Sequence, residues 1–486
     1  MAQNKPNILL VTTDQQRFDT TGAAAPSFMR TPHVDSLRRE GVDFASAYAQ
    51  CPLCVPARVS IMNGKSIFTH GMTRNGKSSD VMGRENTLPT LLREQGYQTC
   101  AVGKMHFSPQ RTRHGFDEMI LPQDYFREMR EKGKNNMLSV GLGQNELYPG
   151  MSTVPEAETL TSWTAEKCVE YLAERRDPGV PFFLWCSFSK PHPPLDPPEP
   201  YYSMYRKCDI PAPVRGAWSE DENCPEPVKR FRQSHSFDRI PDAVIREARA
   251  AYYGLITQID YNLGRILAIL QDSGELYNTL IVYTSDHGEC LGDHHCGSKK
   301  FFYEPAAHVP FVLRMPESWR ERECGMQVDS PVTHSDILPT LLRAAGGDAP
   351  EDTDGQDLIG LVRGELTGPR RHLEATYAAS FDKENYEYLA VTDGKWKYIW
   401  YPEGGREQLF DLRKDPMETD DLSGKNTAKC NELHTLLVEK DRSRGGRLIS
   451  SDRLAERDIR KDSETERRSR NWPGYHTEFC DKDVRH

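Results

Sequence analysis

Short, apolar runs alternate with helical patterns over the first two thirds of the chain. Four of these runs have the length and composition of buried strands and lie at positions 7–13, 97–102, 181–188 and 279–285. Apolar residues at helical spacing, or a closing glycine, indicate helices between them at 32–41, 88–96, 156–175, 243–272 and 334–345. This alternation predicts an α/β fold in which helices sandwich a large, mostly parallel sheet.

The pattern changes after about Thr367. Aromatic and β-branched runs at hairpin-like spacing follow, and then a helical pattern, at 386–392, 395–401, 408–412 and 427–440. We therefore expect a large domain at 1–366 and a small α+β domain with an antiparallel sheet at 367–448. Residues 449–486 carry many charges and few apolar anchors, which favours a solvated tail over a segment that wraps a neighbouring subunit.

Two shorter segments also have expected structures. Residues 42–48 form a single predicted strand that leads towards the cysteine-containing stretch described below. The proline-rich, charged stretch at 194–239 has no clear period, and we expect a long surface excursion there.

The charge and hydropathy of the chain exclude some classes of binding partner. The net charge of the 486-residue chain is −10, and no basic tract stands apart from acidic residues, which argues against nucleic acid. The chain has no apolar run of about eighteen residues to span a membrane, and no signal-peptide pattern at its start. We expect a cytoplasmic protein with a small substrate, in which most of the scattered cysteines are reduced.

The stretch from Cys51 to Lys65 contains a cysteine, a proline and an arginine at a predicted helix start. Because Pro56 suits the first helical turn, Cys54 is expected at or just before the helix N-terminus, with Arg58 one turn further on. Free N–H groups, the helix dipole and Arg58 favour an anion at this place. Alone, the pattern is more typical of a structural cysteine. The Cys-x-x-Cys spacing could indicate a redox pair or half a zinc site, but the lack of a second Cys-x-x-Cys and of a thioredoxin partner sequence disfavours both.

Two predicted strands end in similar polar pairs. Asp14 and Gln15 follow the first strand, and Asp286 and His287 follow the strand at 279–285. Ligands bind at the carboxyl ends of strands in open α/β sheets. Two carboxylates and an amide oxygen suit Ca²⁺, Mg²⁺ or Mn²⁺, and the imidazole favours Mn²⁺. One pair alone would be typical of strand-end capping, but their recurrence predicts a metal site.

Four more basic or titratable side chains lie at predicted strand ends or in the loops that follow: Lys104, His106, His192 and Lys299. Lysine supplies positive charge to a tetrahedral oxyanion, and histidine donates or accepts a proton near neutral pH. Each of them alone is typical of a surface residue. Together with a metal and Arg58, they predict a site that neutralises an ester anion and its transition state.

These residues carry a resemblance to the type I sulfatases, a family of the alkaline phosphatase-like superfamily. Cys54-Val-Pro-Ala-Arg58, followed by Gly64-Lys65, matches the family signature C-x-[PA]-[SA]-R. The similarity extends over most of residues 5–440 and includes Asn7-Ile-Leu-Leu with Asp14, Thr31-Pro-His-Val-Asp-Ser-Leu, Gly103-Lys104-Met105-His106, Lys190-Pro-His192, Ser285-Asp286-His287-Gly288, Lys299 before Tyr303-Glu304, and Gln408-Leu-Phe-Asp-Leu-Arg-Lys-Asp-Pro.

The resemblance implies an alkaline phosphatase-like catalytic domain at 1–366 that hydrolyses a small sulfate monoester. It implies that a formylglycine-generating enzyme oxidises Cys54, and not Cys51, to formylglycine, which is hydrated to a diol. One hydroxyl attacks sulfur and displaces the alcohol, and the other loses a proton so that sulfate is expelled. One divalent metal is implied, with Ca²⁺ expected and Mn²⁺ or Mg²⁺ as alternatives.

The resemblance also implies individual roles. The metal ligands would be Asp14, Gln15, Asp286, His287 and the modified Cys54. Arg58 would orient the diol, His106 would assist it, and His192 would protonate the leaving oxygen. Lys104 and Lys299 would bind sulfate oxygens, and Asn75 is a further substrate contact. We expect the stretch 193–205 and the loops near Asn75 and Cys290 to shape the leaving-group pocket.

Two positions depart from many secreted sulfatases, which have two aspartates at Asp14-Gln15 and Asp-Asn at Asp286-His287. The Gln and His combination resembles cytosolic arylsulfatases, choline sulfatases and phosphonate monoester hydrolases. Hydrolysis of a phosphonate monoester or a phosphodiester is therefore a second hypothesis. A non-catalytic binding protein with an unmodified Cys54 is a third, and the sequence leaves a homo-oligomer open.

Overall fold

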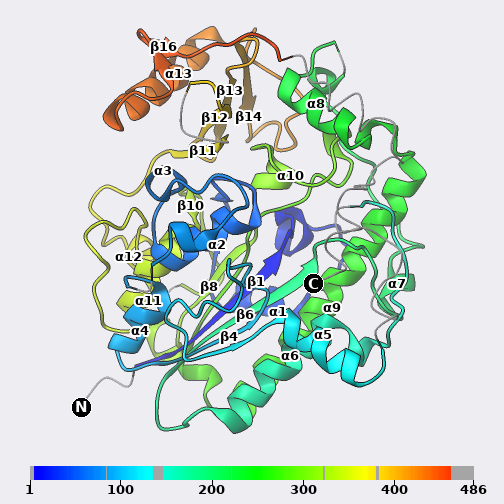
Figure 1. The fold of residues 1–486 in the computed structure, drawn as a ribbon, viewed down its shortest axis with the longest axis vertical. Coiled ribbons are helices and arrows are strands. Elements are labelled where there is room, and N and C mark those ends of the chain that lie inside the picture. The colour runs from blue at the N-terminus through cyan, green and yellow to red at the C-terminus, as the bar shows by residue number, and fades with distance from the viewer. Residues whose placement is uncertain are drawn as a thin grey trace.

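A large mixed sheet lies at the centre of the computed structural model, which describes residues 5–83, 85–134, 146–220, 222–320, 323–378 and 383–460 (Figure 1). Within these residues the sheet has eight strands in the order β5-β4-β6-β1-β7-β8-β2-β9. Its strands are β1 (Asn7–Asp14), β2 (Val42–Phe44), β4 (Gln98–Gly103), β5 (Glu118–Ile120), β6 (Phe182–Pro191), β7 (Thr279–Ser285), β8 (Phe311–Arg314) and β9 (Met326–Val328).

The five strands from β5 to β7 run parallel to one another, whereas β8 is antiparallel to both of its neighbours, β7 and β2. β1 lies in the middle, and Thr13 pairs with Ser285 at its carboxyl end. The predicted mixed, mostly parallel sheet is therefore confirmed. The register also brings the residues after β1 and β7 to the same edge of the sheet.

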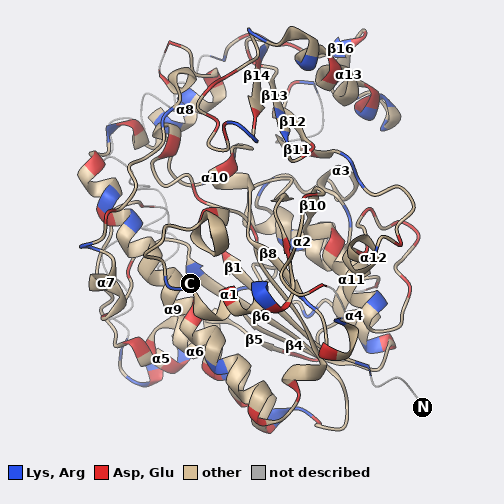
Figure 2. Ribbon diagram, turned by 180° about the vertical axis from the view of Figure 1, so that it is seen from behind, with Lys and Arg blue, Asp and Glu red and all other residues tan. Residues whose placement is uncertain are grey.

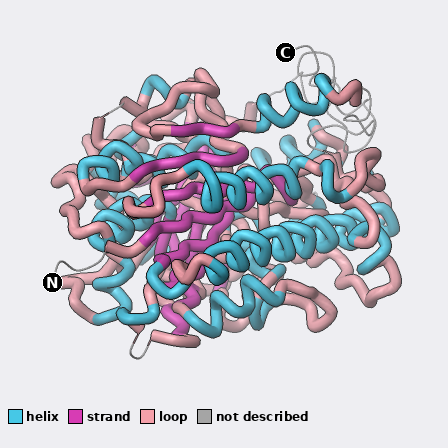
Figure 3. Tube along the Cα trace, turned by 90° about the horizontal axis from the view of Figure 1, so that it is seen from below, coloured by secondary structure: helices cyan, strands magenta, loops and turns pink. Residues whose placement is uncertain are grey.

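Helices cover both faces of this sheet, because its central strands are apolar on both sides. On β1, Ile8 and Leu10 pack with α2, α4, α11 and α12, whereas Leu9 and Val11 pack with α1, α6 and α9 (Figures 1 and 3). The helices are α1 (Pro32–Glu40), α2 (Cys54–Asn63), α3 (Ile67–His70), α4 (Leu88–Glu94), α5 (Pro122–Glu131), α6 (Leu160–Glu170), α7 (Tyr201–Met204), α8 (Glu226–Ser234), α9 (Asp242–Asp272), α10 (Glu304–Ala307), α11 (Ile337–Ala344), α12 (Leu358–Arg363) and α13 (Thr427–Ser443).

A second, antiparallel sheet lies beside the carboxyl edge of the large one. Its order is β11-β12-β13-β14, formed by β11 (Leu373–Ala378), β12 (Tyr386–Thr392), β13 (Trp396–Tyr401) and β14 (Arg406–Asp411). One face packs on α13 through Leu433 and Leu437, and the other packs on Phe301 and Tyr303. The predicted C-terminal antiparallel sheet with its helix is therefore confirmed, and its inner face adjoins the loop that follows Lys299.

Several segments differ from the sequence expectation. The predicted strand at 42–48 is divided at a turn, so that β2 joins the large sheet and β3 (Ala47–Tyr48) pairs with β10 (Val332–Thr333). The predicted helix at 156–175 consists of a 3-10 turn, α6 and a π-helical turn at Tyr171–Arg175. β11 was not predicted, because the sequence Leu373–Ala378 is short and poor in β-branched residues.

The excursion at 194–239 and the start of the C-terminal tail are more ordered than expected. The excursion contains α7 and α8, and Trp218 and Val228 are buried. Residues 449–460 form the hairpin of β15 (Ile449–Ser450) and β16 (Arg453–Leu454), and Leu454 packs beneath the second sheet. Most residues of this segment are nevertheless exposed, and the rest of the expected tail, residues 461–486, lies outside the described residues.

Acidic and basic residues are mixed along the outer helices (Figure 2). Among the described residues, no helix is both long and apolar enough to cross a membrane.

Candidate active site

Cys54 is the first residue of α2, as the position of Pro56 predicted. Leu53 is extended, and Gly64 closes the helix with a left-handed φ of 66°, a conformation that glycine adopts without strain. Apart from Asn63, every α2 side chain is buried. The N-terminus of α2 therefore lies fixed against the carboxyl edge of the large sheet.

Four side chains from three elements converge at this point: Asp14, Cys54, Asp286 and His287. The Sγ of Cys54 lies 3.2 Å from Nε2 of His287 and 3.8 Å from Oδ1 of Asp14. Nε2 of His287 is 3.6 Å from Oδ1 of Asp286, and the four possible ligand atoms lie within 4.8 Å of one another. The cluster is buried and has the donor types of a divalent-cation site.

Arg58 lies one helical turn after Cys54 and fixes both carboxylates. Its Nη2 is 2.9 Å from Oδ2 of Asp286 and 3.4 Å from Oδ2 of Asp14, and its Nη1 donates to Ser187 Oγ at 2.8 Å. The side chain is only 1% exposed. Arg58 therefore joins α2 to the ends of β1, β6 and β7 and does not reach into the open cavity.

Gln15 lies beside this cluster, but its side chain faces elsewhere. Its backbone N–H donates to Oδ1 of Asp286 at 3.1 Å, with φ of 72°. The side-chain amide donates to Glu289 through Nε2 and accepts from the ammonium of Lys299 through Oε1. The structure thus brings Gln15 to the site with its oxygen on Lys299.

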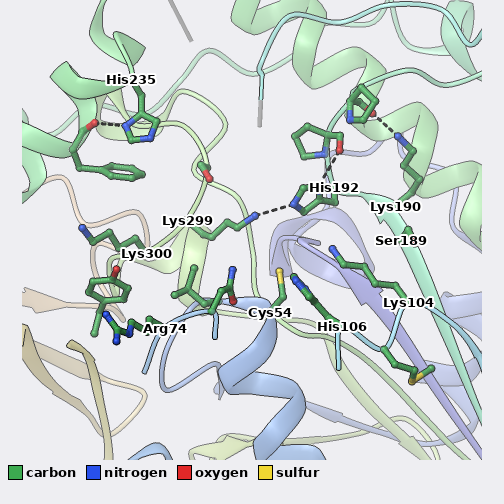
Figure 4. A pocket seen from close by; sticks show the side chains of 18 of the residues that line it. Cys54, Arg74, Lys104, His106, Ser189, Lys190, His192, His235, Lys299 and Lys300 are labelled. Atoms are coloured by element: carbon green, nitrogen blue, oxygen red, sulfur yellow. Dashed lines mark hydrogen bonds between the residues drawn. The ribbon is translucent and has the colours of Figure 1, made fainter. Parts of the chain in front are cut away.

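The remaining predicted residues surround the mouth of the site (Figure 4). Nζ of Lys104 is 2.5 Å from Oδ2 of Asp14, and Nε2 of His192 lies 3.1 Å from Nζ of Lys299. His106 has φ of 57°, and its Nδ1 is buried without a hydrogen-bond partner among the described residues. All four side chains line one cavity of about 1330 Å³ together with Cys54.

Gly103 places Lys104 at this edge. Its φ is 94°, and a Cβ atom there would lie 2.0 Å from the carbonyl oxygen of Ser187. Only glycine lets the ends of β4 and β6 approach so closely.

Cys51, three positions before Cys54, and Asn75 both lie close to the start of α2, but they have different surroundings. Asn75, which also lines the cavity, accepts the N–H of Val55 at 3.1 Å and so braces the first turn of α2. Cys51 is buried and donates to the carbonyl of Thr73 at 3.2 Å, and burial raises the pKa of its thiol. The cysteines among the described residues form no disulfide.

Charge within the site shifts several pKa values. Burial and Asp14 act to raise the pKa of the Cys54 thiol, but Lys104, His287 and Lys299 outweigh them and hold it well below its usual range. Burial and the charge of Asp14 raise the pKa of Asp286. A bound cation would offset this repulsion between two carboxylates, so the donor set fits a divalent metal.

The imidazole of His192 is buried beside positive charges. Burial, Lys299 and Lys104 hold the pKa of its imidazole well below the usual value. Its Nδ1 lies 2.8 Å from the carbonyl of Pro193, and its Nε2 faces the Lys299 ammonium. The proton of this neutral ring therefore lies on Nδ1, and Nε2 is an acceptor.

Sequence reasoning missed two residues of the site. Glu289 is buried and holds the amide of Gln15, although it follows Asp286 by only three positions. Ser187 accepts from Arg58 and lies at the end of a predicted apolar strand. A search for polar residues within buried strand ends would have found both. The expected pocket residues Pro193 and Pro194 line the cavity, whereas Cys290 is not among its lining residues.

The large sheet, with the cluster at its carboxyl edge, defines an alkaline phosphatase-like hydrolase. The solved structure of the phosphonate monoester hydrolase of Agrobacterium radiobacter is similar to this chain with a TM-score of 0.74 and 26% identity, covering 93% of this chain and 99% of that one. A model of the family described as Sulfatase matches residues 6–347, and one described as N-sulphoglucosamine sulphohydrolase, C-terminal, matches residues 292–443. The chain belongs to the sulfatase family.

Named relatives extend over nearly the whole chain. The arylsulfatase of Clostridium perfringens is 33% identical over 462 residues, which are 90% of this chain and 94% of the relative. The choline-sulfatase of Rhizobium meliloti is 30% identical over 449 residues, which are 87% of this chain and 83% of the relative.

Proposed function

We propose that this protein is a formylglycine-dependent sulfatase that hydrolyses a small sulfate monoester to an alcohol and sulfate. One observation carries the proposal: Cys54 of the signature begins a buried helix and lies 3.2 Å from His287 in the cluster with Asp14 and Asp286. Formylglycine made from Cys54 would supply, as its hydrate, a nucleophilic oxygen that a thiol cannot provide. Its oxidation requires the formylglycine-generating enzyme of the host.

The same cluster would hold one divalent metal, with Asp14, Asp286, His287 and the modified Cys54 as ligands. Ca²⁺ is the ion that the family resemblance implies and that the two carboxylates suit, with Mn²⁺, which the imidazole of His287 favours, or Mg²⁺ as alternatives. Gln15 would join the ligands if its Oε1 left Lys299. Such a metal would polarise a sulfate oxygen and lower the pKa of the nucleophile.

The basic side chains would neutralise the sulfate group. Arg58 would hold the carboxylates and the first turn of α2 in place and so orient the nucleophile. Lys104 and Lys299 would bind sulfate oxygens from opposite sides of Cys54, where negative charge increases in the transition state. His106, with its free Nδ1, would contact the hydroxyl that later loses a proton.

Protonation of the leaving oxygen would involve His192 and Lys299 together. Nε2 of the neutral imidazole carries no proton, so His192 alone cannot donate from that atom. We propose that Nε2 takes up a proton from Lys299, which lies 3.1 Å away, and that it delivers this proton to the alkoxide as the S–O bond breaks, after the neutral Lys299 amine has given way to the leaving oxygen. Lys299 regains its proton from solvent.

Substrate profiling tests this function. Protein with formylglycine at position 54 is assayed with an aryl sulfate and with the aryl phosphonate ester of the same phenol. The proposal predicts faster turnover of the sulfate. Faster turnover of the phosphonate would establish the second hypothesis, which the similarity to the Agrobacterium enzyme favours. Turnover of neither, with Cys54 an unmodified thiol in protein from its native host, would favour the binding-protein hypothesis.

A further inference from the structure

The cavity above Cys54 carries more positive charge than one sulfate group requires. Beyond the basic residues around Cys54, the wall formed by the second sheet and its neighbours contains four more cations, which are Arg74, Arg230, Lys300 and Arg460. We propose that Arg74 and Lys300 bind a second anionic group, a carboxylate or a further sulfate, on the alcohol part of the substrate. This inference rests on the proposed sulfatase function and names its class of substrate.

Arg74 is one of two arginines of this wall whose side chains have no carboxylate partner among the described residues; the other, Arg460, donates to the backbone carbonyl of Glu384. Arg74 immediately precedes Asn75, which is bonded to the first turn of α2, so the chain holds it beside the reactive centre. Its side chain is exposed at the cavity and makes no ion pair with any residue that the structure describes. Arg230, by contrast, pairs with both carboxylate oxygens of Glu403 at 2.7 Å.

Lys300 lies on the same side of the cavity as Arg74 (Figure 4). Consecutive side chains of an extended segment point to opposite sides, yet Lys299 and Lys300 both line the cavity. The backbone of Lys300 makes this possible with a φ of 130°, which is rare for a lysine and typical of functional sites. Its ammonium is held 2.7 Å from Glu387 and 4.7 Å from the ring centre of Tyr377.

The wall on the side of Lys190, opposite Arg74 and Lys300, carries no such unpaired cation among the described residues. Lys190 bonds to Asp196 and to the carbonyl of Pro194, and in Figure 4 it points away from Cys54. Apolar or uncharged residues, such as Leu121 and Phe126, line the rest of that side. Glu387, the partner of Lys300, also lines the cavity, so among the described residues the unpaired charge on the side of Lys300 comes from the arginines. This charge lies on one side of the cavity and gives the leaving group a preferred direction.

The test compares ring-substituted substrates. The enzyme with formylglycine is assayed at low ionic strength with 4-nitrophenyl sulfate and with its derivatives that carry a carboxylate or a second sulfate ester at the meta position. The methyl ester of the carboxylate controls for electronic effects on the phenol. We expect kcat/KM to be about tenfold higher for both dianions than for the methyl ester, because charge-assisted hydrogen bonds stabilise the bound dianion. The substrate with the larger gain in kcat/KM shows whether the second site prefers a carboxylate or a sulfate.

Arg74→Gln should lower kcat/KM for the dianions about tenfold and for the methyl ester less than about threefold. Lys190→Gln, the matched control from the opposite wall, should change all values by the same factor. Equal kcat/KM for dianion and methyl ester in the unaltered enzyme, or equal losses in Arg74→Gln, would overturn the inference.

Failure of the sulfatase function itself has a separate signature, because the enzyme would then turn over none of these esters. Calorimetry with the Cys54→Ala protein, which does not consume its ligand, then compares the affinities for the carboxylate and its methyl ester. Tighter binding of the carboxylate, lost in an Arg74→Gln background, supports the anion site, and equal affinities contradict it.

Discussion

Nε2 of His287 lies 3.2 Å from Sγ of Cys54, although 233 positions separate the two residues in the sequence. His287 follows β7 and Cys54 begins α2, and the pairing of Thr13 in β1 with Ser285 in β7 brings Asp14 to the same place. Asp14 completes the arrangement, with its Oδ1 3.8 Å from the same sulfur. The atom that replaces this sulfur in formylglycine would therefore lie next to every proposed metal ligand.

The first prediction separates the two cysteines of the Cys-x-x-Cys spacing. Cys54→Ala should abolish turnover, because no nucleophilic oxygen can form at the cluster. Cys51→Ala should keep most of the activity, since among the described residues Cys51 bonds to the carbonyl of Thr73 and to no group of the cluster, and burial raises the pKa of its thiol. Steady-state assays of both variants provide the measurement, and equal losses would contradict the assignment of the nucleophile.

The second prediction concerns the orientation of the Gln15 amide. Glu289 accepts from Gln15 through Oε2 and from the Leu291 N–H through Oε1 at 3.0 Å. In Glu289→Gln, the carbonyl oxygen keeps the Leu291 bond and its new NH₂ group faces the NH₂ group of Gln15. The Gln15 amide must then rotate, so that its NH₂ group and not its oxygen faces Lys299 and the metal site. We expect metal affinity to fall about 10- to 100-fold.

Calorimetric titration with Ca²⁺ and Mn²⁺ measures this effect. Glu166→Gln on the exposed surface of α6 is the matched control and should bind both metals as the unaltered protein does. If Glu289→Gln bound them equally well, Gln15 would have no part in holding the metal.

The third prediction concerns a buried lysine between the two sheets. Lys397 of β13 is 0% exposed, and its Nζ lies 2.7 Å from carboxylate oxygens of both Glu304 and Glu418. Lys397→Met should lose about 3–5 kcal/mol of stability, because two buried carboxylates lose their counter-ion. Thermal unfolding measures the loss. Lys395→Met, exposed in the same hairpin, should change stability by less than about 0.5 kcal/mol, and similar Tm values for both variants would contradict the account.

The fourth prediction is a pH dependence of stability. Asp260 of α9 accepts the N–H groups of His33 and Val34 at 3.1 and 2.8 Å, and burial raises its pKa to about 7. The pKa of Asp260 is therefore higher in the folded state than in the unfolded state, where it is near 4. The contribution of protonated Asp260 to stability is complete below the unfolded-state pKa and is lost as the pH rises through about 7.

Asp260→Asn mimics the protonated carboxyl and removes this dependence. Its Tm minus that of the unaltered protein should therefore increase between pH 5 and pH 8, as scanning fluorimetry can measure. Asp272→Asn, at the exposed end of the same helix, should show a constant difference. A constant difference for Asp260→Asn as well would show that Asp260 ionises normally.

Much of the fold and of the cluster could be predicted because local pattern determines them. β1 and β7 are apolar on both faces, and the polar residues directly after them must lie at the ligand-binding edge. The proline in the first turn of α2 placed Cys54 at a helix start. β11 was missed because its strand character comes from pairing with β12 and not from its own residues.

Side-chain direction could not be predicted in the same way. The sequence places Gln15 beside Asp14, but its amide direction depends on Glu289 and Lys299, which lie far along the chain. Likewise, the neutral state of His192 depends on the nearness of Lys299, and the shared wall of Arg74 and Lys300 depends on the packing of the second sheet. Such relations exist only in the folded molecule.

Mass spectrometry of the peptide that contains Cys54, combined with a sulfate-release assay, tests the central claim most directly. The protein is produced with and without a formylglycine-generating enzyme, and the fraction of formylglycine at position 54 is compared with kcat for an aryl sulfate. We predict that kcat rises in proportion to this fraction and approaches zero for unmodified Cys54. Full turnover with an unmodified thiol, or no turnover with complete formylglycine, would contradict the account.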